Sequence, residues 1–233
     1  MRLRLQFSKG ESVRYISHLD LARVFERAIR RAKLPVAMSE GFNPHMKVAY
    51  ASALSVGVTS DCEYMDIELR EDASAEEMAA ALKQQLPAGL KLAEYRLLKQ
   101  VPKALMAVVN LADYVITVPV QSSTDADQLK ILLEQFMTAQ STTFVRRSPK
   151  GNRTIDIRPL IDIIKVTSCV TGMATFFLRS FITDKGSVKP QEVMRVLVEQ
   201  YGLPLLSDNP LVHRSALYVQ REGALLSPID VIR

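Results

Sequence analysis

The spacing of apolar residues predicts strands and helices in alternation over the first hundred residues. Apolar and polar positions alternate over 3–7 and again over 63–69, which is typical of half-buried strands. Between them, a helix is predicted from Ser17 to about Lys33, ending before Pro35 because proline cannot continue a helix. Its expected core stripe consists of Leu21, Phe25, Ala28 and Ala32, with Val24 and Ile29 beside it.

Further elements complete this half. Short strands are predicted at 36–38 and 47–51, a second helix from Ser74 to about Leu86, and a closing strand at 90–98. Ser17 and Asp20 have the spacing of a capping box, so the first helix begins there. The order is strand, helix, strand, strand, helix, strand, which is that of a ferredoxin-like fold.

The rest of the chain repeats this order in outline. Strands are predicted at 114–120, 174–179 and 214–220, helices at 125–137 and 189–201, and a hairpin over 143–158 with its turn at 148–152. We therefore predict an α/β (α+β) protein of tandem ferredoxin-like βαββαβ halves with antiparallel sheets. The predicted halves are residues 1–103 and 104–233.

Composition indicates the cellular compartment of the protein. Hydrophobic residues make up 48% of the chain and charged residues 24%, as in ordinary globular proteins. The first ten residues lack the apolar stretch of a signal peptide, and the apolar run at 104–109 is too short to cross a bilayer. Cys62 and Cys169 are too few to hold a zinc ion or an iron–sulfur cluster. We expect a cytoplasmic protein with no membrane segment, metal or cofactor.

Positive charge is concentrated in two places. Residues 1–50 contain 10 Lys/Arg and 4 Asp/Glu, a net charge of +6, although the whole chain carries only +5. Residues 146–165 contain 6 Lys/Arg and 2 Asp/Glu, a net charge of +4. Two basic segments on a nearly neutral body favour local binding of an anion, although a basic segment can also be a solvated surface.

The first predicted helix carries the sharper of these signals. Arg23, Arg27 and Arg30 are spaced at i, i+4 and i+7 opposite the core stripe, with Arg31 beside them. Arginine suits phosphate because its planar guanidinium donates two parallel hydrogen bonds. The candidate RNA-binding residues are Arg14, Arg23, Arg27, Arg30, Arg31, His45 and Lys47 near the first helix, and Arg146, Arg147, Lys150, Arg153 and Arg158 on the hairpin.

The histidines allow a catalytic alternative. His18 lies in the first turn of the arginine-rich helix, where it could act as an acid or base on a phosphodiester, or simply form hydrogen bonds at a helix start. His45 follows the turn-forming residues 41–44, and His213 lies near the last strand. The sequence contains no GxxxxGK[ST], GxGxxG, HExxH or GxSxG motif.

Residues 16–58 resemble a bacterial family of uncharacterised proteins that accompany radical SAM proteins, as a neighbouring chain or as a domain fused to their C-terminal end. The segments that carry the resemblance are Ser17–Asp20, Phe25–Arg31, Leu34–Pro35, Gly41–His45 and Ile155–Pro159. Relatives usually follow the position of His45 with proline, whereas this chain has Met46. The family brings no established catalytic residues. Because this chain has only two cysteines and no CxxxCxxC motif, a radical SAM cluster would belong to its partner.

Three functional hypotheses follow from these observations. The first is an accessory protein, without an activity of its own, that binds or presents RNA to a radical SAM enzyme. The second is a metal-independent endoribonuclease that uses His18, by analogy of fold with CRISPR repeat-processing endoribonucleases. The third is a module that binds only the radical SAM protein.

Overall fold

The computed structural model describes residues 1–100, 103–148, 151–184, 186–207 and 209–231, and the chain divides into two compact units. The first unit comprises Met1–Asn110 together with Ala216–Arg233, and the second comprises Leu111–Ser215. The sequence-based division lay at 103/104 and placed 216–233 in the second half. These C-terminal residues belong to the first unit because buried side chains of that unit bind them, as described below.

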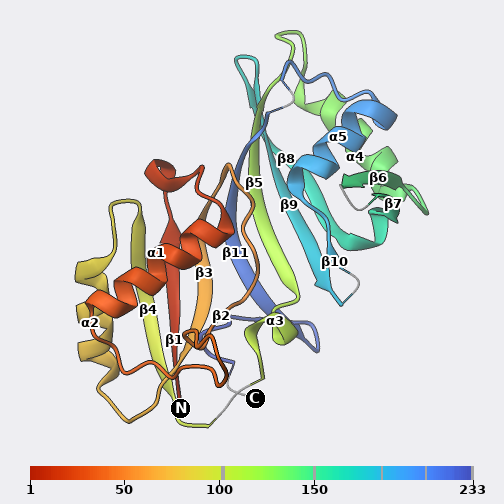
Figure 1. Ribbon diagram of the computed structural model, residues 1–233. Helices are drawn as coiled ribbons and strands as arrows, with labels where there is room; N and C mark the ends of the chain where they lie inside the picture. The colour runs from red at the N-terminus through yellow and green to blue at the C-terminus, as the bar shows by residue number, and fades with distance from the viewer. Residues whose placement is uncertain (101–102, 149–150, 185, 208, 232–233) are drawn as a thin grey trace. The chain divides into compact units, whose positions relative to one another are not determined.

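The first unit is an antiparallel sheet with two helices on one face (Figure 1). Strand β1 pairs with β3 and β4, and β2 pairs with the other edge of β3, giving the order β2-β3-β1-β4. The elements are β1 (Arg2–Lys9), a 3₁₀ turn (Glu11–Val13), α1 (His18–Arg31), β2 (Val48–Tyr50), β3 (Val58–Glu68), α2 (Ala75–Gln85), β4 (Leu90–Leu98) and α3 (Leu105–Val108).

The core of this unit lies between the sheet and the helices. Leu3, Leu5 and Phe7 of β1 point to the helical face because alternate residues of a strand share one side. Helix α1 covers them with its apolar stripe, and Ser17 caps it by accepting a 3.1 Å hydrogen bond from the Asp20 amide, as predicted. The buried residues of α1 are Leu21, Phe25, Ala28 and Ile29.

The opposite face of β1 is closed by the C-terminal residues. The Arg4 side chain is fully buried and donates to both carboxylate oxygens of Asp66, at 2.7 and 2.9 Å. It also donates to the backbone carbonyls of Pro228 and Val231, both at 2.7 Å. One guanidinium therefore connects the first strand, β3 and the end of the chain. On the same unit, Arg96 forms a 2.8 Å ion pair with Asp230.

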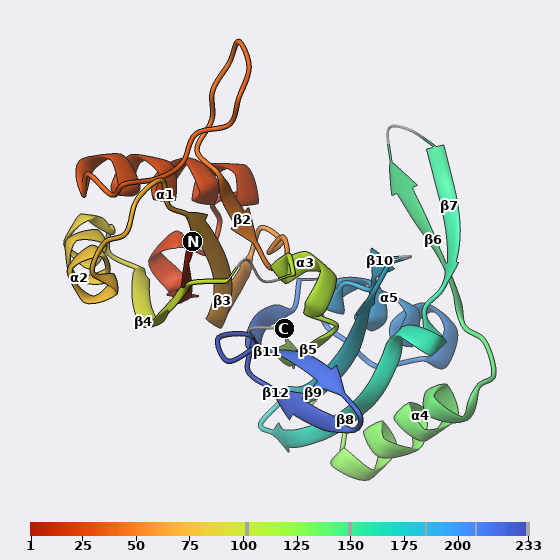
Figure 2. The same cartoon turned by 90° about the horizontal axis from the view of Figure 1, so that it is seen from below.

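The second unit also combines an antiparallel sheet with helices. Strand β9 pairs with β5, β8 and the short β10, so β9 lies between β8 and β5. A separate two-stranded arm, β6–β7, precedes β8 (Figure 2). The elements are β5 (Leu111–Pro119), α4 (Ala126–Thr138), β6 (Thr143–Ser148), β7 (Gly151–Asp156), a 3₁₀ turn (Arg158–Leu160), β8 (Ile161–Val170), β9 (Met173–Thr183), β10 (Gly186–Ser187), α5 (Pro190–Tyr201) and the first part of β11 (Leu211–Arg221), which continues into the first unit. Strand β12 (Ala224–Leu226) belongs to the first unit, where it pairs with the end of β11.

The predicted fold class is confirmed, since both units combine helices with antiparallel strands. The description of the two halves as tandem ferredoxin-like domains stays a prediction. Strand β8 was not expected from the sequence. Within the described residues, no helix is both long and apolar enough to span a membrane.

Candidate functional site

Helix α1 carries an exposed row of arginines on the side away from its core stripe. Arg23, Arg27 and Arg30 are all exposed, whereas Phe25 and Ile29 between them are fully buried. Arg23 pairs with Asp20 at 3.0 Å, one turn earlier. Within the described residues, the guanidinium groups of Arg27 and Arg30 make no hydrogen bond or ion pair, so both can bind an external anion.

Arg31 lies at the edge of this surface. Its guanidinium donates to the side-chain oxygen of Gln85 at 3.1 Å and to the Gln85 carbonyl at 2.7 Å, which joins the end of α1 to the end of α2. We define the α1 basic face as Arg23, Arg27 and Arg30, with Arg31 as its structural border.

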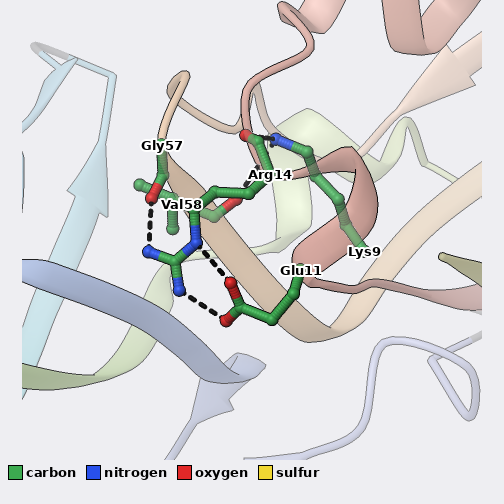
Figure 3. Close-up of polar contacts among 5 residues, drawn as sticks. All are labelled: Lys9, Glu11, Arg14, Gly57 and Val58. Atoms are coloured by element: carbon green, nitrogen blue, oxygen red, sulfur yellow. Dashed lines mark hydrogen bonds and ion pairs between the residues drawn. The ribbon is translucent and has the colours of Figure 1, made fainter.

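Arg14 was predicted as an RNA-binding residue, but the structure gives it a structural environment (Figure 3). It is buried, and it forms a two-point ion pair with Glu11 and donates to the Gly57 carbonyl at 3.0 Å. The hydrogen bond to Glu11 raises the pKa of Arg14. The group is therefore occupied within the fold, and we do not include it in the proposed interface.

Lys9 holds the loop around Arg14 by three hydrogen bonds. The Lys9 ammonium is buried and donates to the carbonyls of Arg14 and Val58 at 2.8 and 3.1 Å (Figure 3). It also donates to the carbonyl of Ile16 at 3.3 Å. Burial lowers the pKa of Lys9, with Glu63 opposing that effect. The three carbonyls fix the segment that leads into α1.

Residues 39–45 form a protruding loop between α1 and β2. Its base is closed by hydrogen bonds from the Ser39 amide to the His45 carbonyl and from the His45 amide to the Ser39 hydroxyl, at 2.8 and 3.0 Å. His45 is exposed, and its Nδ1 lies 2.8 Å from the Ser39 hydroxyl. Phe42 at the tip is fully exposed. Lys47, just beyond, is exposed and pairs with Glu68 at 3.1 Å.

His18 lies in an aromatic cluster rather than in an open cleft. Its ring packs edge-on against Tyr50, with 5.1 Å between centroids, and Tyr50 in turn contacts Phe7 and Phe25. Burial raises the pKa of the Tyr50 hydroxyl. This packing gives His18 structural contacts at the start of α1, and catalysis by His18 stays a prediction.

The predicted basic hairpin exists, but its arginines differ in their environments. Arg146 of β6 donates to both oxygens of Glu192 at 2.8 and 2.6 Å and to the Ser187 carbonyl at 3.0 Å. Arg158 donates to the carbonyls of Met137 and Ile161, so it joins α4 to β8. Arg147 and Arg153 are exposed. Lys150 lies outside the described residues.

Two basic residues that the sequence analysis did not select lie beside the hairpin. Lys189, just before α5, and Arg195, within α5, are both exposed. They line a groove together with Arg146 and Arg147. They are separated from the hairpin by about forty residues of sequence, so a search for local charge clusters could not associate them with it. Across the described residues, no three acidic, histidine or cysteine side chains are grouped as a metal would require.

The fold and these surfaces define an α/β protein with antiparallel sheets and separate basic surfaces on each unit. Residues 2–190 match the family model described as an uncharacterized protein conserved in bacteria (DUF2344), and the chain belongs to that family. The match confirms the expected bacterial family, and the association with radical SAM proteins stays a prediction. A search of curated proteins found no match.

Solved structures with a similar fold include a chain of a Cbf5–Nop10–Gar1 complex, with 10% identity and a TM-score of 0.51 over 99% of this chain and 53% of that chain. A chain of the archaeal box H/ACA sRNP Nop10–Cbf5 complex has 8% identity and a TM-score of 0.50, over 99% of this chain and 52% of that chain. The protein therefore spans about half the length of these chains. At such low identity the likeness concerns the fold alone.

Proposed function

We propose that this protein is a cytoplasmic RNA-binding accessory protein that presents RNA to a radical SAM enzyme. The observation that carries the RNA part is the α1 basic face, where the guanidinium groups of Arg27 and Arg30 are exposed and make no ion pair within the described residues. Within the described residues, Cys62 and Cys169 form no disulfide, which suits a reducing compartment. The radical SAM partner is proposed from the resemblance of residues 16–58.

The fold likeness lends this proposal limited support. The two solved structures above belong to a Cbf5 complex and to an sRNP, so a related arrangement of helices and strands occurs in ribonucleoprotein particles. Fold does not determine function, so the proposal rests on the charge and exposure of the α1 side chains.

The test is a salt titration of binding to a fluorescein-labelled oligouridylate and to total small RNA from a bacterium. The wild type is compared with Arg27→Glu/Arg30→Glu and with Lys91→Glu/Lys99→Glu, which changes two exposed lysines on and just after β4 by the same net charge. Each phosphate contact to a single strand contributes about 0.7 to the slope of log K against log salt, so losing two contacts lowers the slope by about 1.4.

We expect the α1 variant to bind at least tenfold more weakly and with the shallower slope, while the β4 variant changes little. Equal losses in both variants would mean that only overall charge matters. An unchanged slope in the α1 variant would contradict the assignment.

A second candidate, a module that binds the radical SAM protein without RNA, is favoured by Phe42. A fully exposed phenylalanine at the tip of a braced loop is a typical anchor for a protein partner. Co-purification of the tagged protein with a co-expressed radical SAM protein from the same genome tests it. Loss of capture by Phe42→Ser, with RNA binding unaltered, would assign partner binding to this loop.

A further inference from the structure

The second unit contains a groove between the β6–β7 arm and the start of α5, with a volume of about 260 Å³. Its lining includes the side chains of Phe144, Arg146, Arg147, Lys189, Gln191 and Arg195. All of these residues belong to the second unit, so the groove does not depend on the α1 basic face.

The charge in this groove is strongly positive even after internal pairing. Glu192 is the only acidic residue in its lining, and both of its oxygens are taken by Arg146 while one also accepts from the Lys189 amide at 2.9 Å. Arg147, Lys189 and Arg195 are exposed. The lining contains four basic side chains and one carboxylate, a formal surplus of three positive charges, which attracts an anion.

The pairing of Arg146 also fixes its geometry. Its Nε and Nη2 atoms are held by Glu192 and by the Ser187 carbonyl, so the guanidinium plane is set before any ligand arrives. Among the described residues, its Nη1 atom donates to no acceptor and remains available. A guanidinium that is already oriented loses less entropy when it binds an anion.

Gln191 indicates that the ligand carries a hydrogen-bond donor as well as negative charge. Its side-chain oxygen is buried and, within the described residues, accepts no hydrogen bond. A buried acceptor left without a donor is costly, and rotation of this side chain into the groove would let a hydroxyl group of a ligand supply the donor. A phosphate beside a ribose hydroxyl meets both requirements.

We propose that this groove binds a ribose phosphate, with the phosphate between Arg146, Arg147, Lys189 and Arg195 and a ribose hydroxyl at Gln191. The phosphate belongs either to an RNA strand, in which case the inference rests on the proposed function and gives RNA a second contact, or to a free mononucleotide. Residues Lys189, Gln191 and Arg195 are the new members of this site.

The experiment uses the full chain with Lys189→Gln/Arg195→Gln, which removes two exposed charges. The matched control is Lys91→Gln/Lys99→Gln, outside the groove. The probes are a labelled oligouridylate, followed by anisotropy, and uridine 5′-monophosphate, followed by the Nε–Hε signals of Arg146 and Arg195 in ¹⁵N-arginine-labelled protein. Far-UV circular dichroism verifies that each variant is folded.

We expect the groove variant to bind oligouridylate about tenfold more weakly than the control, with a slope lower by about 0.7, the loss of one phosphate contact. The mononucleotide should shift the Arg146 signal in the wild type but not in the groove variant. That result supports the site even if no RNA binds, in which case only the proposed function fails. Equal behaviour of wild type and groove variant toward both probes overturns the groove, whatever the α1 variant shows.

Discussion

Replacement of Arg4 by methionine tests the link between the first strand and the end of the chain. Methionine keeps an unbranched apolar side chain of similar length in the space that Arg4 fills. The substitution removes the two guanidinium donors to the Asp66 carboxylate. It also removes the donor to the carbonyls of Pro228 and Val231.

The expected loss is large because both ionic partners are buried. The side chains of Arg4 and Asp66 are 0% and 2% exposed, so solvent cannot replace the missing guanidinium. Breaking a buried pair by removing one partner costs about 3–5 kcal/mol, mainly because the other charge stays buried. The two carbonyls add to this loss, although the contributions of one network are not additive.

Urea unfolding followed by circular dichroism and by limited proteolysis measures the effect. We expect Arg4→Met to lower the free energy of unfolding by about 3–5 kcal/mol, and Arg4→Met/Asp66→Leu to recover at least half of it by removing the stranded carboxylate. The control is Arg2→Met, on the same strand. Arg2 forms a 3.8 Å ion pair with Glu68 whose side chains are 21% and 33% exposed, so the pair is worth about 1 kcal/mol or less. A loss below about 1 kcal/mol for Arg4→Met would refute this reasoning.

Three further outcomes are expected. Burial raises the pKa of Tyr64 to about 12, so the folded protein keeps a proton that the unfolded chain loses above pH 10. Urea unfolding at each pH should therefore show the free energy of unfolding falling from pH 10 to 12, and falling less in Tyr64→Phe. Burial lowers the pKa of Lys9, so the folded protein loses this proton at a lower pH than the unfolded chain does. As pH rises toward 10.5, the free energy of unfolding of the wild type should therefore increase relative to that of Lys9→Met, and a relative decrease would contradict this reasoning. Gly89→Ala should cost about 2–4 kcal/mol, because φ is +93° and the new Cβ would crowd the Ser12 hydroxyl and the methyl groups of Val13. Gly57→Ala, at φ +82° with open space, should cost about 1–2 kcal/mol, and equal thermal shifts of the two variants would exclude crowding as the cause.

The helices were predictable from local signals. Ser17 caps α1 as its spacing predicted, Ser74 caps α2, and Pro190 begins α5. These signals act within one turn of helix, so they can be interpreted without tertiary contacts. The arginine row of α1 was predictable for the same reason, because helical spacing alone sets which residues share a face.

Strand β8 was missed for a physical reason. Its pairing with β9 shifts register between Ile161 and Ile163 and again between Val166 and Ser168. Each irregularity interrupts the alternation of inward and outward residues that marks a strand in a sequence. The period of two is therefore absent from the segment 161–170, even though it pairs along most of its length.

The partners of isolated charges could not be predicted either. The acceptors of Arg158 are backbone carbonyls of Met137 and Ile161, and Arg14 donates to the carbonyl of Gly57 as well as to nearby Glu11. A carbonyl acceptor leaves no trace in residue type, so a structural arginine and a ligand-binding arginine are indistinguishable in the sequence. Opposite charges are more visible, but Arg146 and Glu192 are separated by forty-six positions.

The return of the chain to its first unit has a consequence for biosynthesis. A ribosome delivers residues 1–110 long before 216–231, and the donors of Arg4 have no carbonyl of Pro228 or Val231 to bind until then. The second unit is continuous in sequence and can fold as soon as it emerges. The Arg4 guanidinium therefore lacks these two carbonyl acceptors until residues 228–231 have been made, so the first unit is completed only after the second unit has emerged.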